Sequence, residues 1–370
     1  MLYMAICLCA CSRGDEDKNI KDAAAVSLEL KYAGQYTVDL YDDGYRHIHI
    51  ADGTDYVCVP EGAQKTDLGY EGAVIIQLPV NEIYLAASSA MDLFARLDSL
   101  DSIGSCSTTA EDYTIEEAKE RIESGDIRYV GRYAAPDYEA IIDSCCSLAI
   151  ESTMITHSPE TKEELERLGL PVLVERSSYE KDPLGRLEWI KLYGVLLGKE
   201  EEAAAFFDAQ EEKLRTVREG LDIKDENERL SVAFFYVSAN GYINIRKPGD
   251  YISTMIEMAG GRYCPGDMDT GEANALSTMN INWEQFYAEA SQADILIYNS
   301  TIDGGVKTLA DLVDKNSLCE DFKAVKTGRV YCTDTDVFQK SSAVCDVILD
   351  LYRVINGDGK DELVYIYELK

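Results

Sequence analysis

Apolar residues with helical spacing fill the middle of the chain, from Asp182 to Gly220. Asp182 followed by Pro183 predicts a helix start, because aspartate caps a helix and proline fits its first position. Gly198 predicts the end of this helix, and Gly220 predicts the end of a second one. Roughly twenty helical residues reach about 30 Å, the width of a small domain. We therefore interpret residues 182–220 as a rigid connector between two lobes; a helical hairpin inside one large domain is the alternative.

Short apolar segments alternate with helical segments before this connector. Short apolar runs are typical of strands buried on both faces, and their alternation with helices indicates a parallel sheet covered on both sides. This pattern predicts a first α/β lobe. Its expected strands are 74–78, 103–107, 128–130, 148–150 and 171–175, and its expected helices are 81–97, 114–125, 137–145 and 159–168.

The same alternation returns after the connector and predicts a second, smaller α/β lobe. Residues 137–142 and 282–287 share a pattern in which Asp or Asn precedes an aromatic residue and then glutamate at a helix start. The second lobe thus repeats features of the first. Its expected strands are 230–237, 242–247, 295–298 and 329–332, and its main expected helices are 251–259, 283–290 and 342–355.

Three segments of alternating polarity precede the first lobe. Asp-Gly pairs separate them, which predicts a small β-meander with tight turns. The expected organisation is a signal peptide at 1–11, a tether at 12–34, the first lobe with its leading meander at 35–181, the connector at 182–220 and the second lobe at 221–370.

The chain is strongly acidic, with a formal net charge of −33 over 370 residues. Such a surface repels the phosphates of nucleic acids and of anionic lipids. We therefore exclude nucleic acid as a partner and expect a monomer that contacts the membrane only through an anchor.

The first ten residues are almost wholly apolar but too short to span a bilayer. Leu8-Cys9-Ala10-Cys11 resembles the lipobox of bacterial lipoproteins, in which the last cysteine is lipidated and becomes the new N-terminus. The resemblance implies that Cys11 anchors the protein outside the cytoplasm, on the bacterial cell membrane. A removed signal peptide or a chance apolar start is the alternative.

The sequence lacks the familiar motifs of enzyme chemistry. It has no G-x-S-x-G elbow, no P-loop and no H-E-x-x-H. The eight cysteines after Cys11 show no C-x-x-C spacing, which argues against a structural zinc site and leaves disulfide pairing open. Three histidines, His47, His49 and His157, are too few for a His-rich metal site. We therefore expect no catalysis, no metal site and no bound cofactor.

Five short motifs stand in order between residues 70 and 335. They are Gly131…Ala135-Pro136-Asp137-Tyr138-Glu139, Leu165-Glu-Arg-Leu-Gly169-Leu-Pro171-Val172, Leu196-Leu-Gly198-Lys199-Glu200, Met258-Ala-Gly260-Gly261 and Ala324-Val-Lys326-Thr-Gly328-Arg329-Val330. Their order and spacing resemble the substrate-binding proteins of ABC importers for ferric siderophores, haem and cobalamin. The resemblance implies an α/β fold of two Rossmann-like lobes joined by a single long α-helix, with the ligand cleft between them.

In that family a glutamate on each lobe contacts arginines of the permease. The matching positions here are Glu139 and Glu284. Exposed carboxylates of this kind accept bidentate hydrogen bonds from arginine, which would fix the register of docking as well as its strength. The alternative is that both residues only stabilise their helix N-termini. The implied partners are an ABC permease with its ATPase.

Ligands of α/β sheets bind beyond the carboxyl ends of strands. Arginine there could bind the oxygens of a negatively charged chelate, and tyrosine could stack on its rings. Pairing of each cation with a nearby acid such as Asp250 is the alternative, and Trp189 either faces the cleft or fills the core. The candidate ligand-binding residues are Arg132, Tyr133, Arg176, Tyr179, Trp189, Tyr236, Arg246, Lys247 and Asn299.

Together these features predict an extracytoplasmic lipoprotein that captures an iron chelate, such as a ferric siderophore, and delivers it to an ABC permease. Haem or cobalamin is the alternative ligand. A hydrolase or an adhesion protein is the alternative of a different class.

Overall fold

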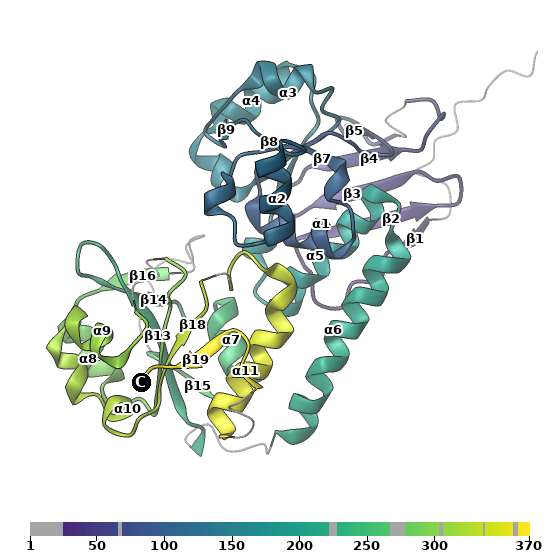
Figure 1. Ribbon diagram of the computed structural model, residues 1–370. Coiled ribbons are helices and arrows are strands. Elements are labelled where there is room, and N and C mark those ends of the chain that lie inside the picture. The colour runs from purple at the N-terminus through teal and green to yellow at the C-terminus, as the bar shows by residue number, and fades with distance from the viewer. Residues whose placement is uncertain are drawn as a thin grey trace, which may run out of the picture.

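Two α/β lobes lie at the two ends of a helical connector in the computed structural model of the chain (Figure 1). The structure describes residues 25–65, 69–221, 228–266, 278–302, 306–335, 337–357 and 362–370. Cys11 and the expected signal peptide lie outside these residues. In the part that is described, no helix has both the length and the apolar character needed to cross a bilayer.

The connector consists of α5 (Pro183–Leu197) and α6 (Glu200–Gly220), in agreement with the sequence. The Asp182 side chain caps α5 by accepting a hydrogen bond from the Leu184 amide at 2.8 Å. Gly198 ends α5 in the left-handed conformation, with φ of 68°, where a residue without a Cβ is favoured. Figure 1 shows α6 running from the upper lobe to the lower one, so the connector is not buried within a single lobe.

The first lobe is built on a parallel five-stranded sheet in the order β12-β11-β6-β7-β8. This confirms the parallel sheet. Its strands are β6 (Ile83–Leu85), β7 (Ile103–Cys106), β8 (Arg128–Tyr129), β11 (Ala149–Ser152) and β12 (Val172–Glu175), with a small hairpin of β9 (Gly131–Arg132) and β10 (Ala135–Pro136). Its helices are α1 (Met91–Arg96), α2 (Glu116–Ser124), α3 (Tyr138–Asp143) and α4 (Pro159–Arg167).

The start of the first lobe differs from the prediction. Residues 83–85 form a fully buried strand, whereas a helix was expected from residue 81. The segment expected as the first strand of the lobe, β5 (Val74–Gln77), pairs instead with the meander. A short apolar run fits a buried strand and a buried helix equally well, so the pattern alone could not distinguish them.

The meander is a five-stranded sheet in the order β1-β2-β3-β4-β5. β1 to β4 run antiparallel, and β5 adds in parallel to β4. Residues 25–27, which lie within the expected tether at 12–34, form the edge strand of this sheet. The bounds of the first four strands are β1 (Ala25–Ser27), β2 (Tyr36–Tyr41), β3 (Arg46–Ile50) and β4 (Asp55–Val59).

Residues 31–33 are fixed to the connector by one buried carboxylate. Glu188 of α5 is fully buried and accepts hydrogen bonds from the backbone amides of Lys31, Tyr32 and Ala33 at 2.8 to 3.1 Å. The Lys191 ammonium donates to the same carboxylate at 2.8 Å. This arrangement satisfies backbone groups that no sheet or helix would satisfy, and it ties the segment before the meander to the centre of the molecule.

The second lobe has a seven-stranded mixed sheet. β15, β13, β17 and β18 are parallel, and β14, β16 and β19 pair antiparallel. The strands are β13 (Ser231–Val237), β14 (Ile243–Arg246), β15 (Arg262–Cys264), β16 (Thr278–Ile281), β17 (Ile295–Tyr298), β18 (Val330–Thr333) and β19 (Ile366–Glu368). The helices are α7 (Tyr251–Met258), α8 (Trp283–Ala290), α9 (Leu309–Lys315), α10 (Lys323–Lys326) and α11 (Val344–Asn356).

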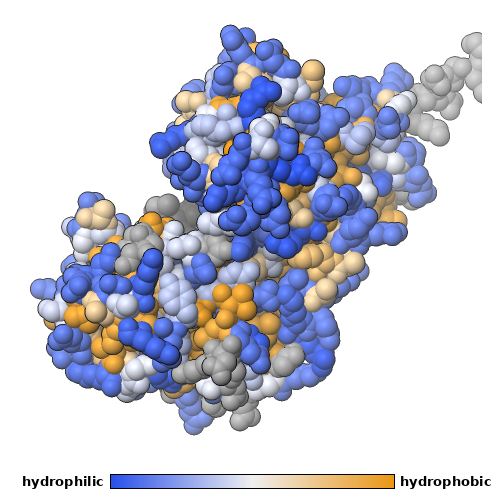
Figure 2. Space-filling view, in the orientation of Figure 1, coloured by the Kyte–Doolittle hydropathy of each residue, from blue (hydrophilic) through white to orange (hydrophobic). Residues whose placement is uncertain are grey.

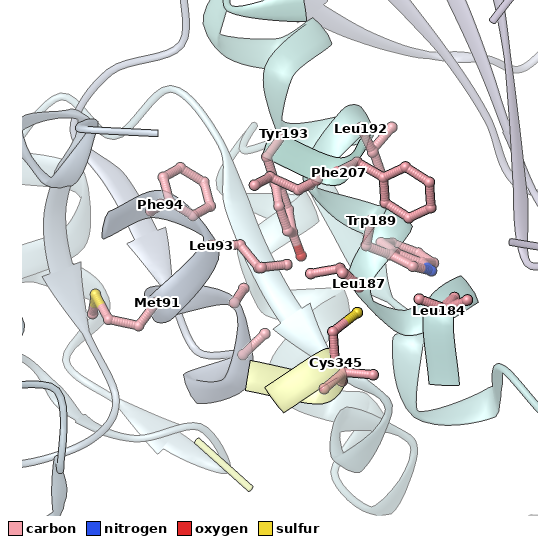
Figure 3. Close-up of a cluster of buried hydrophobic side chains, with 14 of the residues drawn as sticks. Met91, Leu93, Phe94, Leu184, Leu187, Trp189, Leu192, Tyr193, Phe207 and Cys345 are labelled. Atoms are coloured by element: carbon pink, nitrogen blue, oxygen red, sulfur yellow. The ribbon is translucent and has the colours of Figure 1, made fainter. Parts of the chain in front are cut away.

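One hydrophobic core continues from the meander through the connector into the second lobe. Figure 3 shows its centre, where Leu93 and Phe94 of α1 and Cys345 of α11 lie around Tyr193 and Leu187 of α5. Two smaller clusters cover the outer faces of the second and the first lobe. The inner faces of both lobes thus share one core around α5.

Candidate functional site

The two lobes meet through a segment that follows β18. The Gln339 side chain accepts hydrogen bonds from the amide and hydroxyl of Thr114 and donates to the Asp112 carbonyl. The Ser342 amide donates to Asp92 at 2.7 Å, and the Ser341 hydroxyl donates to a carbonyl of the first lobe. We call residues 339–342 the inter-lobe clasp. It is a second link between the lobes, in addition to the connector.

Figure 2 shows an indented outline between the lobes, on the side away from α6. Among the described residues, a narrow crevice lies where α5 meets α7, residues 337–341 and the start of α11. Arg186, Tyr251, Phe338, Lys340 and Ser341 contribute to its walls, and its free volume is about 20 Å³. That volume holds one water molecule or one small polar group. All of its lining residues belong to α5 or to the second lobe, and we call it the α5–α7 crevice.

Two guanidinium groups flank one aromatic ring at this crevice. The Cζ atom of Arg186 lies 4.0 Å from the centroid of the Tyr251 ring, and that of Arg246 lies 4.9 Å from it. Phe338 contacts Tyr251 edge-on, with ring centroids 6.2 Å apart. Sequence reasoning missed Arg186 and Tyr251. Arg186 could have been found, because it is a lone cation in the first turn of an otherwise apolar helix start.

Arg246 is committed to a structural contact. It is buried, and its guanidinium makes two hydrogen bonds to the Asp250 carboxylate, at 2.7 and 2.8 Å. Pairing with Asp250 and proximity to Tyr251 raise the pKa of Arg246 against the opposing effect of burial. The alternative expected from the sequence, pairing with a neighbouring acid, therefore applies to Arg246.

Arg176 and Tyr179 lie against the meander. The Arg176 Nε donates to the Gln35 side chain at 3.3 Å, its Nη1 lies 3.9 Å from Asp52, and its Cζ lies 4.5 Å from the centroid of the Tyr179 ring. These contacts join the residue after β12 to Gln35, just before β2, and to Asp52 in the turn after β3. The two residues thus lie together next to the meander.

Trp189 belongs to the core. Its side chain has no exposed surface, and its indole N–H donates to Glu180 at 3.1 Å. Tyr36 packs edge-on against it, with ring centroids 5.0 Å apart. The expectation that Trp189 contacts a ligand is therefore wrong, because the meander and α5 enclose it completely.

The remaining candidates are spread over both lobes. Arg132 is exposed on the β9–β10 hairpin, whereas Tyr133 is half-buried against the outer core of the first lobe. Tyr236 packs on the outer core of the second lobe, and buried Asn299 accepts a hydrogen bond from the Thr301 hydroxyl. Lys247 is half-buried directly after β14. The structure brings only Arg246, among the nine candidates, to the crevice walls through its contacts with Tyr251 and Phe338.

Glu139 and Glu284 occupy equivalent places on the two lobes. Both are exposed, and each lies in the first turn of its helix, α3 or α8. Asp137 and Asn282 cap these helices by accepting hydrogen bonds from backbone amides at 3.0 and 2.8 Å. Figure 1 places α3 in the upper lobe and α8 in the lower one. Neither glutamate makes a hydrogen bond or ion pair with the described residues.

Glu151 lies at the carboxyl end of β11 but does not reach solvent. It is fully buried, and neither carboxyl oxygen has a hydrogen-bond partner among the described residues. Burial raises the pKa of Glu151 to about 8. The side chain therefore carries a proton at neutral pH.

His47 and His49 of β3 have structural partners in the meander. His47 Nε2 and His49 Nδ1 each lie 2.9 Å from the same oxygen of Asp55, and the His47 ring stacks on Tyr70. The described residues hold no group of three or more His, Cys, Asp or Glu side chains suited to a metal ion. The eight cysteines from Cys58 onward are free, and all but Cys145 are buried.

A larger hollow is remote from the crevice. It has a volume of about 670 Å³ and lies beside the amino ends of β6 and β7, where Glu82, Asp101 and Asp126 line it. Ligands of α/β sheets bind at the carboxyl ends of strands, not at their amino ends. The α5–α7 crevice is therefore the better candidate despite its small size.

Comparisons with known proteins support this architecture. A family model described as "Periplasmic binding protein" matches residues 83–337. The uncharacterized lipoprotein MJ0878 of Methanocaldococcus jannaschii is 26% identical over 312 residues, which span 81% of this chain and 70% of that protein.

Two solved structures share the fold. A periplasmic heme binding protein from Pseudomonas aeruginosa has a TM-score of 0.61 at 16% identity, and the match covers 79% of this chain and 99% of that one. A periplasmic binding protein from Veillonella parvula has a TM-score of 0.61 at 12% identity, covering 90% of this chain and 99% of that one. These findings confirm the resemblance and the two-lobed fold inferred from the sequence.

Proposed function

The chain belongs to the periplasmic binding protein family, and from that premise we propose that it is the substrate-binding component of an ABC importer. It captures an iron chelate outside the cytoplasm and delivers it to a permease with its ATPase. The observation that carries this proposal is the family match over residues 83–337 together with the lobe–connector–lobe fold. The protein acts by binding and docking, without catalysis and without a resident cofactor.

An iron chelate is favoured by two charges at the crevice and by one structural neighbour. Arg186 and Lys340 lie on the crevice wall in a chain of net charge −33, and positive charge of this kind suits an anionic ligand. The neighbour from Pseudomonas aeruginosa is named a heme binding protein, which makes haem the second candidate beside a ferric siderophore.

Titration of the purified chain tests the ligand. Ferric siderophores, haem and cobalamin are added separately while tyrosine and tryptophan emission is recorded, because a coloured ligand within a few tens of ångströms quenches it. We expect saturable quenching by one iron chelate. Saturation by cobalamin alone would contradict the iron assignment, and no binding across the panel would contradict the proposed function.

Docking through Glu139 and Glu284 is tested by charge reversal. E139K and E284K should abolish uptake in cells that carry the permease and leave the affinity for the ligand unchanged. Glu160 is the matched control, because it is also an exposed glutamate in the first turn of a helix, α4. If E160K lowers uptake as much, the glutamates act only through their helix N-termini and the docking role is wrong.

Anchoring through Cys11 is supported by the sequence Leu8-Cys9-Ala10-Cys11 and by the lipoprotein name of MJ0878. The protein expressed in bacteria with radioactive palmitate should become labelled and remain in the membrane fraction. C11S should lose the label, whereas C9S should keep it. Equal labelling of C11S and the wild type would contradict the assignment.

A further inference from the structure

The first turns at the start of α11 are capped by the other lobe. Neither Lys340 nor Ala343, which precede these turns, has a side chain that caps them. The Ser342 amide donates instead to Asp92 of α1 at 2.7 Å. Asp92 has no exposed surface, and its second oxygen accepts a hydrogen bond from the Arg96 Nε at 3.3 Å. An anionic cap is stabilising there, because the helix dipole is positive at its amino end. A residue of the first lobe thus stabilises a helix of the second.

Gln339 adds three hydrogen bonds to the same boundary. Its Oε1 accepts from the Thr114 amide at 2.9 Å and from the Thr114 hydroxyl at 3.1 Å, and its Nε2 donates to the Asp112 carbonyl at 2.7 Å. One side chain therefore uses both its acceptor and its donor on the first lobe. The Ser341 hydroxyl donates to the Ser89 carbonyl at 2.8 Å. The clasp thus binds two separate segments of the first lobe, residues 89–92 and 112–114.

These contacts border an apolar junction between the lobes. Leu93 follows Asp92 directly, Cys345 lies three residues after Ser342, and both belong to the core around α5 (Figure 3). The clasp is therefore the polar edge of a surface whose interior is apolar. Its five hydrogen bonds start from four consecutive residues, so a displacement of one lobe that breaks one of them strains the others as well.

We propose that the inter-lobe clasp is a latch between the lobes. Its five hydrogen bonds form and break together, and their rupture lets the lobes separate as rigid bodies about the connector. The purpose of the latch rests on the proposed function. It holds the lobes around a captured molecule, and a docked permease has this defined set of contacts to break before release.

Hydrogen exchange at two amides tests whether the contacts are linked. Q339A removes the acceptor of the Thr114 amide and leaves Asp92 in place for the Ser342 amide, and D92A does the reverse. In a latch, each variant speeds exchange at the amide whose own acceptor remains. A hydrogen bond to a charged group corresponds to about 10- to 100-fold in an equilibrium constant, and a neutral one to about 2- to 10-fold. We expect D92A to speed exchange at the Thr114 amide by the larger factor and Q339A to speed it at the Ser342 amide by the smaller one.

Asp350 and Gln77 provide matched controls. Asp350 is also fully buried and accepts hydrogen bonds from the backbone amides of residues 364–366, but all these groups belong to the second lobe. The Gln77 side chain donates to three backbone carbonyls between residues 59 and 78. D350A and Q77A should leave exchange at the Thr114 and Ser342 amides unchanged. An equal rise in D350A would indicate general destabilisation, and a rise only at the amide that lost its acceptor would indicate independent contacts. Either result would overturn the latch.

A distance measurement tests the movement of the lobes without any ligand. Glu163 of α4 and Ala288 of α8 are exposed, so spin labels on E163C and A288C report the distance between the lobes by double electron–electron resonance. The full chain carries serine in place of its other cysteines outside the buried set, Cys7, Cys9, Cys11 and Cys145. We expect the double variant D92A/Q339A to add longer distances, and D350A and Q77A to match the unaltered protein.

This measurement also separates the latch from the proposed function. An unchanged distance distribution in D92A/Q339A would overturn the latch, whether or not the chain binds an iron complex. Longer distances in a chain that binds no ferric siderophore and no haem would support the latch and contradict the proposed function alone.

Discussion

Replacement of Glu188 should destabilise the protein more than any single surface change. In E188Q the amide keeps one acceptor oxygen for three backbone N–H groups, and the buried ammonium of Lys191 loses its carboxylate partner at 2.8 Å. Removal of one member of a buried ion pair costs roughly 3 to 5 kcal/mol. The total stability of a typical domain is only about 5 to 15 kcal/mol, so E188Q should lose a large share of it.

Glu211 gives an unusually close control for this experiment. It also binds residues 31 and 32, through the Lys31 ammonium at 2.7 Å and the Tyr32 hydroxyl at 2.6 Å, but from the more exposed helix α6. Surface pairs of this kind contribute about 0 to 1 kcal/mol. E211Q should therefore lower the free energy of unfolding by no more than about 1 kcal/mol, although it affects residues of the same segment, 31 and 32.

Urea denaturation measures both variants. The free energy of unfolding in water is obtained from the midpoint and the slope of the transition. E188Q should also become more sensitive to proteolysis within residues 25–36, because the backbone N–H groups of residues 31–33 lose the carboxylate that accepts their hydrogen bonds. An unfolding free energy of E188Q within about 1 kcal/mol of the wild type, or a loss equal to that of E211Q, would refute the reasoning.

Three further predictions concern the core and the clasp. The pKa of glutamate is near 4.5 in the unfolded chain and about 8 for folded Glu151. Between these pH values the folded state therefore holds one more proton than the unfolded state. As a result, the free energy of unfolding falls by about 1.4 kcal/mol for each unit that the pH rises. The stability of E151Q relative to the wild type should therefore grow between about pH 5 and pH 8.5 in urea titrations, and a constant difference would contradict this. A Cβ on Gly194 would lie 2.7 Å from the Cβ of Ala203. G194A should therefore lower the free energy of unfolding by about 1 to 3 kcal/mol, although alanine favours helices. The added change A203G should restore part of this stability. D92A leaves the Ser342 amide without its acceptor and should increase hydrogen exchange at that amide while exchange in α8 stays unchanged.

The sequence predicted the connector and the lobes because their signals are local. Asp182, Pro183 and Gly198 mark the helix ends through their own backbone preferences, and the structure shows α5 and α6 where they were expected. Residues 83–85 were misassigned, because a short buried apolar run has no period that distinguishes strand from helix. The place of β5 in the meander depends on its pairing with β4, which no local pattern encodes.

The candidate site was harder to predict for the same reason. Rules on strand ends selected charged residues but not their partners, so Arg176 and Arg246 were proposed although Gln35 and Asp250 already bind them. Trp189 was an open choice between cleft and core, and its enclosure depends on Tyr36 far away in the chain. Arg186 carried a usable signal, because it is the one charged residue in the first turn of α5.

The shared core around α5 has a consequence for how the protein unfolds. Residues from the meander, both lobes and the connector belong to one continuous set of buried side chains, so neither half can melt without exposing apolar surface of the other. A calorimeter should record a single endotherm, and a fragment cut after Leu221 should fail to reach a native state by itself. Partial openings that would admit ligand by local melting of one half are therefore disfavoured by the architecture itself.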